Sequence, residues 1–359
     1  MAIKGKHIKI LYTYPGVKST FVAKDIRLLS QHYQVNEYAF DLTKKKLLLW
    51  ELLKQKLSII KSLFGTSVYI VKFGGYWSLL SVLFARFFGK KSIIITGGTD
   101  CVSFPKMAYG NFQNKTLAWF TRKSFQNAHH IIALHDSMMH SDYSYDNCFF
   151  KEQGLKVHIP NLKTPYSIAY NGYDADLWKK TSEKKKGSFL TVASGLGEER
   201  RRILKGIDTI LQIANQFPDN DFIIVGSNEN ELAEHPKNVI LKPKSNAEEL
   251  KLLYSQAEFY LQLSMSEGFP NSLCEAMLCE CVPIVSNVAS MPFIIDNSGF
   301  ILMRKDINSL KGIVQKALES DTESLGKEAR QRIAENFTEE NRAIGLNKAI
   351  ELVLSRPNP

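Results

Sequence analysis

The sequence has no uninterrupted run of about 18 apolar residues, the length that a membrane-spanning helix requires. Its first residues lack an apolar core followed by a cleavage site of small residues, so we do not expect secretion. The five cysteines are odd in number and show no zinc-type spacing, which is typical of free thiols in a reducing compartment. These absences predict a cytoplasmic protein.

Acidic residues are scarce in the first half of the chain. Residues 1–168 contain 23 Lys and Arg against 9 Asp and Glu, whereas the remainder contains 23 against 27. A basic half favours an anionic partner such as a membrane surface, although a lysine-rich soluble domain has the same composition. Nucleic acid is not expected as that partner, because the sequence has no recognition helix and no basic strand interleaved with aromatic residues.

The chain does contain a regular alternation of short apolar runs and segments of helical period, which is the pattern of parallel α/β units. The alternation restarts after residues 171–187, where Asn-Gly, two Asp and a run of lysines indicate a linker. We therefore predict an α/β protein of two doubly wound Rossmann-like domains, 1–168 and 169–337, facing across a cleft at the carboxyl ends of their strands. The expected strands are 7–13, 35–40, 67–71, 92–96 and 130–134 in the first domain, and 188–193, 221–225, 238–241, 258–262, 282–285 and 299–302 in the second.

Residues 42–64 differ from their surroundings, with six lysines and Trp50 among leucines. On a helix, their apolar side chains recur at steps of three and four residues and form one face. A basic amphipathic helix of this kind can lie in an anionic membrane interface. The alternative is an ordinary helix that packs this face on its own sheet. The face consists of Leu49, Leu52, Leu53, Leu57, Ile60 and Phe64.

The segment 264–277 combines several features of an anion site. An apolar strand leads into a loop with Gly268, and a helix is expected to start near Asn271 or Ser272, which are good N-caps. The first turn of a helix presents unpaired backbone N–H groups that bind anions. Glu267 and Glu275 bracket this turn, so a diphosphate at the helix end would have a carboxylate on either side for sugar hydroxyls.

A second basic element follows the strand that ends near residue 193. Three arginines, Arg200 to Arg202, and Lys205 lie within six residues. Such a cluster can neutralise the charge that develops on a leaving diphosphate. A solvated basic loop is the alternative.

The string E-G-F-P-N-S-L-C-E resembles the Glu-x7-Glu motif of the retaining glycosyltransferases of family 4, and Arg200-x4-Lys205 followed by glycine is similar to their basic pair. The resemblance implies the GT-B fold, with the C-terminal helix at 338–359 packing back on the first domain. It implies that Glu267 contacts the donor sugar, that Glu275 binds the ribose, and that Arg200 and Lys205 hold the diphosphate. The remaining donor-binding residues it implies are Gly268, Phe269, Pro270, Asn271, Ser272 and Leu273.

Three positions depart from the family pattern or match it loosely. Gly16 follows the first strand, where the family has a glycine-rich loop near the phosphates. Asp100 follows Gly97-Gly98-Thr99, where relatives often have a histidine, and is a candidate catalytic carboxylate on the acceptor side or a turn residue. Glu280 stands where relatives have glycine, and we expect that its turn does not demand a positive φ.

The resemblance predicts a retaining transfer of a hexose-type sugar from a nucleotide diphosphate, UDP or GDP, to an acceptor hydroxyl. The acceptor is expected to be a glycan or a lipid-linked glycan in the synthesis of cell-surface polysaccharide or glycoconjugate, with the enzyme peripheral on the inner membrane face. No Asp-x-Asp motif stands in a place suited to a metal, and the basic residues can replace a cation, so no metal or other cofactor is expected. The alternatives are a non-catalytic nucleotide- or sugar-binding protein and another GT-B enzyme, such as a nucleotide-sugar epimerase.

Overall fold

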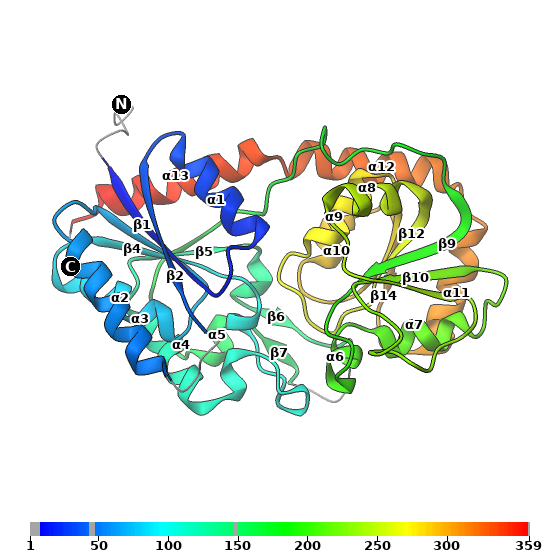
Figure 1. Ribbon diagram of the computed structural model, residues 1–359, viewed down its shortest axis with the longest axis horizontal. Helices are drawn as coiled ribbons and strands as arrows, with labels where there is room; N and C mark the ends of the chain where they lie inside the picture. Colours follow the sequence, from blue (N-terminus) through cyan, green and yellow to red (C-terminus); the bar gives the residue numbers. More distant parts are fainter. Residues whose placement is uncertain (1–7, 43–46, 147–149, 358–359) are drawn as a thin grey trace.

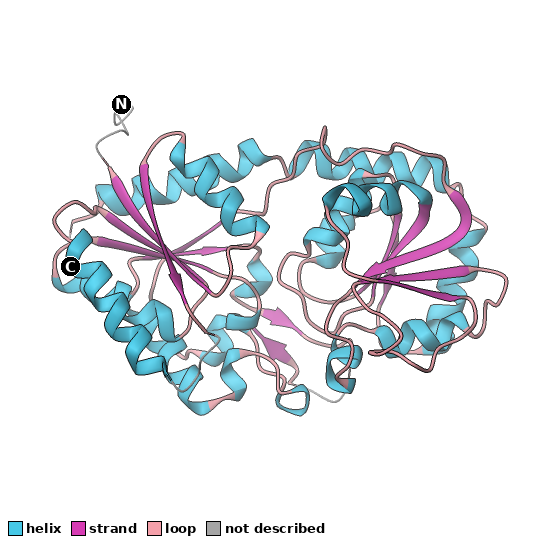
Figure 2. Cartoon of the chain, viewed as in Figure 1, coloured by secondary structure: helices cyan, strands magenta, loops and turns pink. Residues whose placement is uncertain are grey.

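The computed structural model describes residues 8–42, 47–146 and 150–357. Two six-stranded sheets, each covered by helices, lie side by side in it (Figure 1, Figure 2). The first sheet has the order β2-β1-β3-β4-β5-β8 and the second β11-β10-β9-β12-β13-β14. All neighbouring strands within them are parallel, which confirms the predicted α/β architecture with two doubly wound sheets.

All eleven expected strands are present, and their ends differ from the prediction by up to three residues; His7, the first residue of the first expected strand, lies outside the described residues. Central strands such as β3, β4 and β13 are buried along their whole length, as expected for parallel strands with helices on both faces. The sheets add β8 and a short antiparallel pair, β6 and β7, which the prediction missed. The strands are β1 Lys9–Pro15, β2 Gln34–Phe40, β3 Val68–Lys72, β4 Lys91–Ile95, β5 His130–Ala133, β6 Ser141–Asp142, β7 Glu152–Gln153, β8 Tyr166–Ile168, β9 Lys185–Val192, β10 Asp221–Val225, β11 Val239–Lys242, β12 Ala257–Gln262, β13 Val282–Ser286 and β14 Phe300–Leu302.

The helices follow the strands in the order expected of α/β units, and buried apolar side chains form one continuous cluster across both sheets. The helices are α1 Thr20–Ser30, α2 Leu48–Ser62, α3 Tyr76–Phe87, α4 Lys115–Asn127, α5 Leu155–His158, α6 Glu199–Leu204, α7 Ile207–Ala214, α8 Ala247–Gln256, α9 Asn271–Leu278, α10 Met291–Ile295, α11 Ile307–Leu318, α12 Thr322–Asn336 and α13 Glu339–Ser355. Among the described residues, no helix is both long enough and apolar enough to cross a bilayer.

The short helix α6 ends just before α7 begins, and Gly206 separates the two helices. Gly206 has a φ of +70°, and a β-carbon there would lie 2.2 Å from the carbonyl oxygen of Leu263. Only glycine allows both this conformation and this close approach. The break ends α6 and leaves Lys205 at the junction with α7, at the carboxyl edge of the second sheet.

The chain crosses between the two sheets twice, and the crossings run side by side. Tyr173 forms a parallel β-bridge with Thr338, and its N–H donates to the carbonyl oxygen of Phe337 at 2.8 Å. After this point α13 returns along the first sheet and contacts α1 (Figure 1). There the buried Arg342 guanidinium donates to both carboxylate oxygens of Asp25, at 2.8 and 2.7 Å.

The expectation that the turn at Glu280 does not demand a positive φ is wrong. Glu280 has a φ of +62°. The N–H of Cys281 donates to the carbonyl of Ala276 and the N–H of Glu280 to that of Met277, at 3.0 and 2.9 Å. These two bonds are the Schellman motif, which ends α9 with a left-handed residue that is usually glycine. Glu280 therefore adopts the glycine conformation, and its side chain pairs with Lys180 at 2.6 Å.

Candidate active site

A lysine and a glutamate meet at the carboxyl edge of the second sheet. Nζ of Lys205 lies 2.7 Å from Oε1 of Glu267, which stands in the loop after β12. Gln262, the last residue of β12, donates to the same oxygen at 3.2 Å and fixes the carboxylate in place. Burial alone would lower the pKa of Lys205, but the negative charge of Glu267 and its hydrogen bond raise the pKa above the usual value. The lysine therefore remains a cation beside its carboxylate.

Helix α9 begins four residues after Glu267. Its first internal hydrogen bond runs from the N–H of Cys274 to the carbonyl of Pro270, at 3.5 Å. The N–H groups of the three preceding residues have no partner within the helix, which makes this end suited to an anion. These N–H groups belong to Asn271, Ser272 and Leu273.

The expectation that Asn271 or Ser272 caps α9 through its side chain is wrong, because the N-cap is Pro270. Oδ1 of Asn271 instead accepts hydrogen bonds from Tyr173 at 2.8 Å and from Asn171 at 3.2 Å. The hydroxyl of Ser272 donates to Gln262 at 3.3 Å. These side chains anchor the start of the helix to the chain crossing and to β12.

Glu275 lies one turn inside α9, and its carboxyl is half-buried. Burial raises the pKa of Glu275 to about 7, although the positive charge of Lys24 acts in the opposite direction. Lys24 comes from α1 of the first domain, and its Nζ donates to the carbonyl of Gly172 at 2.5 Å. The site at α9 therefore includes a charge from the other domain.

A cavity of about 280 Å³ opens at the carboxyl ends of β9 and β10. Arg201 and Lys205, four residues apart and so on one side of α6, line its wall. Arg200 is exposed and is not among the lining residues, and Arg202 donates to the carbonyl of Leu196 at 2.8 Å. The arginine that shares a cavity with Lys205 is thus Arg201, rather than the Arg200 of the family spacing.

The loop between Glu267 and α9 is held by the second domain and by residues at the chain crossing. The carbonyl of Gly268 accepts a hydrogen bond from Ser290 at 2.6 Å. Phe269 is buried, and its ring lies 5.8 Å from that of Tyr170 and 5.4 Å from that of Phe337. These contacts fix the backbone at the start of α9.

The first domain approaches this loop with Gly97 and Gly98, which follow β4. A β-carbon on Gly268 would lie 2.3 Å from the carbonyl oxygen of Gly97. Where relatives have the histidine, this chain therefore has glycines whose backbone lies in close contact with the second domain.

Asp100 is part of the same loop and is fully buried. Its carboxylate accepts hydrogen bonds from the N–H groups of Gly74 at 2.8 Å, Gly97 at 2.9 Å and Gly98 at 3.1 Å. Burial raises the pKa of Asp100, and these hydrogen bonds oppose the rise. These contacts are those of the turn residue that the sequence left as an alternative, and a catalytic role of Asp100 stays a prediction.

Two tyrosines of the first domain reach the site, and no sequence motif indicated them. Tyr143, in the segment between β6 and β7, donates to the carbonyl of Met265 at 3.1 Å. The hydroxyl of Tyr109 lies 3.1 Å from that of Thr99. Burial and the nearby carboxylate of Glu267 raise the pKa of Tyr109, which therefore stays a neutral phenol next to the charged pair.

Gly16 lies at the carboxyl end of β1 with a φ of +67°, and its N–H donates to the carbonyl of Phe40 at 2.8 Å. This bond joins the turn to the end of β2. A contact between Gly16 and the donor stays a prediction.

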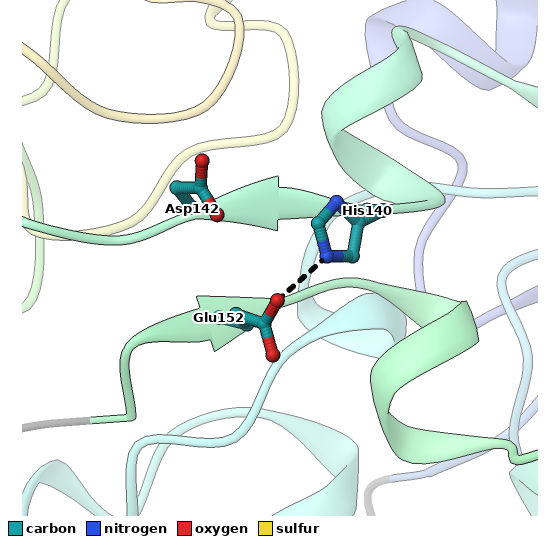
Figure 3. Close-up of side chains that lie close together, drawn as sticks. All are labelled: His140, Asp142 and Glu152. Carbon is teal, nitrogen blue, oxygen red and sulfur yellow. Dashed lines mark hydrogen bonds and ion pairs between the residues drawn. The ribbon is translucent and has the colours of Figure 1, made fainter.

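The residues described include one cluster of side chains of the kind that binds metals: His140, Asp142 and Glu152 on β6 and β7 and just before them (Figure 3). Nε2 of His140 lies 3.1 Å from Oε1 of Glu152, and all three side chains are exposed. Exposed acidic groups often gather without an ion, so the cluster by itself assigns no metal.

Several solved structures share this arrangement of two domains over nearly the whole chain. Sucrose-phosphate synthase from Thermosynechococcus elongatus superposes with a TM-score of 0.73 and 15% identity, covering 97% of this chain and 99% of the other. A glycosyltransferase from Rickettsia africae ESF-5 gives 0.70 and 13% over 97% and 99% of the two chains. Anabaena Alr3699/HepE in complex with UDP and glucose gives 0.68 and 13% over 96% and 100%.

The fold is GT-B.

Residues 174–340 of this GT-B chain match the family model of glycosyl transferases, group 1. The O-antigen chain mannosyltransferase B of Escherichia coli is 29% identical over 75 residues, 21% of this chain. That match spans about a fifth of the length of the curated relative. Together the fold and the family match support a glycosyltransferase, and the matched segment contains Lys205, Glu267 and Glu275.

Proposed function

We propose that the protein is a retaining glycosyltransferase that moves a hexose from a nucleoside diphosphate to an acceptor hydroxyl. The observation that carries the proposal is the Lys205–Glu267 pair beside a helix end with three N–H groups that have no intrahelical partner. This arrangement provides positive charge for a diphosphate and a carboxylate for sugar hydroxyls within one loop. A simple binding protein needs no such fixed cation next to its sugar carboxylate.

In the proposed mechanism the α9 N–H groups, Lys205 and Arg201 hold the diphosphate. The charge that develops on the leaving diphosphate is stabilised by groups already in place, which lowers the barrier. A diphosphate oxygen then accepts the proton of the attacking acceptor hydroxyl on the same face of the sugar, so the anomeric configuration is retained. Glu267 orients the donor sugar, and Glu275 accepts hydrogen bonds from the ribose.

The donor and acceptor classes are proposed from the named relatives. An O-antigen chain mannosyltransferase and a structure with UDP and glucose both favour a hexose, and the second favours UDP. The O-antigen chain named for the first favours a glycan of the cell surface as the acceptor. GDP as the other nucleotide and a lipid-linked acceptor are proposed from the motif resemblance alone. We further propose that no metal takes part, because Lys205 and Arg201 supply the positive charge. Turnover that excess chelator abolishes and Mg²⁺ restores would contradict this.

A thermal-shift panel of UDP, GDP, ADP and CDP and their hexoses tests the proposal on the wild type and on Glu275→Ala. We expect one nucleotide to raise the Tm of the wild type and to have little effect on the variant. The matching sugar nucleotide is then incubated with the enzyme, and NMR of the released sugar reports its anomeric configuration. Inversion would exclude the retaining mechanism. Binding without release or transfer of sugar would favour the non-catalytic alternative.

A further inference from the structure

Helix α2 turns polar side chains towards the protein and apolar side chains towards solvent, which is the reverse of an ordinary surface helix. Towards the protein it buries Glu51, Gln55 and Ile59, and the Gln55 side chain donates to the carbonyl of Trp77 at 2.6 Å. Towards solvent it presents the predicted apolar face together with Trp50, except for Leu52, which packs against a buried cluster of the first domain. The side chains of Leu49, Trp50, Leu53, Leu57 and Ile60 are 42 to 79% exposed. The alternative that this face packs on the sheet therefore holds for Leu52 alone, and the exposed side chains are not covered by any part of the described chain.

Helix α3 extends this apolar surface. It packs beside α2 through a small cluster that includes Ile59, Ala85 and Phe84, on the outer side of the first domain (Figure 1). Leu83 and Phe87 of α3 are exposed beside Arg86, and Phe64 just beyond α2 is 96% exposed. Monomeric soluble proteins rarely expose a large group of neighbouring apolar side chains unless these side chains bind a partner. We define the outer face as Leu49, Trp50, Leu53, Leu57, Ile60, Phe64, Leu83, Phe87 and Phe88.

The exposed charge on α2 and α3 themselves is of one sign, although the exposed Asp41 lies just before α2 in the chain. Residues 42–135 contain 14 Lys and Arg and two carboxylates, Glu51 and Asp100. Both carboxylates are buried, so this stretch offers no exposed negative charge at all. Lys54, Lys56 and Lys61 of α2 are exposed among the leucines. The partner of the face must therefore be apolar and anionic at once.

A second copy of the chain does not meet this requirement. A two-fold dimer brings the same patch of both copies together, so these lysines would oppose lysines without a carboxylate between them. An anionic bilayer offers hydrocarbon for the leucines and phenylalanines, an interface for Trp50 and phosphates for the lysines. We propose that the outer face docks the protein on the surface of an anionic membrane.

Docking through this face would bring the first domain close to a lipid-linked acceptor, which the proposed function includes. A cavity of about 500 Å³ lies at the N-terminal ends of α2 and α3. Its wall is largely apolar, with Leu42, Leu48, Tyr76, Trp77 and Leu117, and also contains Asp41, Gln113 and Asn114. These residues follow β2, β3 and β4, so the cavity lies at the carboxyl edge that also carries Gly98. An acceptor held in the bilayer would reach this edge without leaving the lipid. This step rests on the proposed function, whereas the docking itself does not.

Vesicle co-sedimentation without nucleotide tests the docking. Vesicles of phosphatidylcholine alone are compared with vesicles that contain phosphatidylglycerol, at low and high salt. We expect the wild type to sediment with the anionic vesicles and to be released in part by salt. Each lysine at a membrane surface contributes about a fivefold increase in partitioning. Lys56→Glu with Lys61→Glu is therefore expected to weaken binding at least about 25-fold.

Matched variants separate the face from a general change of charge or polarity. Lys311→Glu with Lys316→Glu makes the same charge change on exposed positions of α11, and Ile344→Glu places a carboxylate on an exposed apolar position of α13. Both controls are expected to bind like the wild type, whereas Trp50→Glu with Leu53→Glu is expected to lose binding. All are exposed positions, and an unchanged Tm checks that the variants fold.

Three results would overturn the proposal. One is equal recovery with neutral and anionic vesicles. Another is full binding by Trp50→Glu with Leu53→Glu. The third is a wild-type dimer in solution that Leu53→Glu converts to a monomer, which would assign the face to a second copy. A chain that docks but binds no nucleotide would keep this inference and contradict the proposed function instead.

Discussion

Gly98 and Gly268 belong to different domains, yet a β-carbon on Gly98 would lie 2.9 Å from the α-carbon of Gly268. The two loops that carry them follow β4 and β12 and meet beside the Lys205–Glu267 pair. The close approach depends on the absence of side chains on both sides. The contact between Gly98 and Gly268 therefore joins the two domains and also helps to set the geometry of the candidate active site.

Substitution of Gly268 by alanine tests this link. The added methyl group would lie 2.3 Å from the carbonyl oxygen of Gly97, so the loops must separate. A displacement of about 1 Å at reacting groups costs on the order of 100-fold in rate. We expect kcat to fall by about this factor, measured as release of nucleoside diphosphate. Gly312→Ala, whose methyl group would meet nothing within 4 Å, is the control and should leave kcat unchanged.

The two neighbouring arginines are expected to differ in donor binding. Arg201 lines the cavity with Lys205, whereas Arg200 points into solvent. A hydrogen bond to a charged group contributes about 1.5 to 3 kcal/mol. Arg201→Ala should therefore weaken binding of the nucleoside diphosphate by about 10- to 100-fold in calorimetry. The affinity of Arg200→Ala should stay within about twofold of the wild type. If Arg200→Ala instead weakened binding more than Arg201→Ala, Arg200 would be the arginine that binds the diphosphate, as the family spacing implies.

Glu275 is expected to make stability depend on pH. Because its pKa in the folded protein is raised to about 7, the folded state holds a proton that the unfolded state releases near pH 4.5. The contribution of this group is fully present below pH 4.5 and is lost as pH rises to 7. We expect the loss to be about 1 to 2 kcal/mol, because the carboxyl keeps some contact with solvent. Urea unfolding of the wild type and Glu275→Gln from pH 4 to 8 measures the difference, and parallel curves would contradict it.

At position 280 the left-handed backbone is expected to favour glycine over alanine. A left-handed conformation costs about 1 to 2 kcal/mol for a residue with a side chain. Glu280→Gly and Glu280→Ala both lose the pair with Lys180, so their difference isolates the backbone. We expect the glycine variant to be more stable than the alanine variant by about 1 kcal/mol in the free energy of unfolding. Equal stabilities would mean that the turn relaxes.

The strands, the order of the elements and the segment with Glu267 and Glu275 could be predicted from the sequence, because they follow from local periodicity and a contiguous motif. The choice of Arg201 over Arg200 could not, since it depends on the rotation of α6, which Gly206 sets by contact with Leu263. Burial of Glu51 and Gln55 in α2 also contradicts the local pattern. Only the packing against α3 reveals it.

Contacts across the domains were outside the reach of a single sequence. Tyr109 and Tyr143 lie in loops without a recognisable motif. The residues of the second domain that they approach, Glu267 and Met265, are far away in the chain. From the sequence, Asp100 fitted both a catalytic role and a role in a turn. Its three N–H donors are visible only once the loops after β3 and β4 are placed together.

The return of α13 to the first sheet means that the first half of the molecule is made of two separate pieces of chain, whereas the second half is one continuous piece. During synthesis the second sheet is complete before the ribosome releases the helix that the first sheet still lacks. Until then Asp25 has no Arg342, and a buried carboxylate without its cation is strongly destabilising. Domains usually form in the order of their synthesis. In this chain the half that is made first is therefore the one that is finished last.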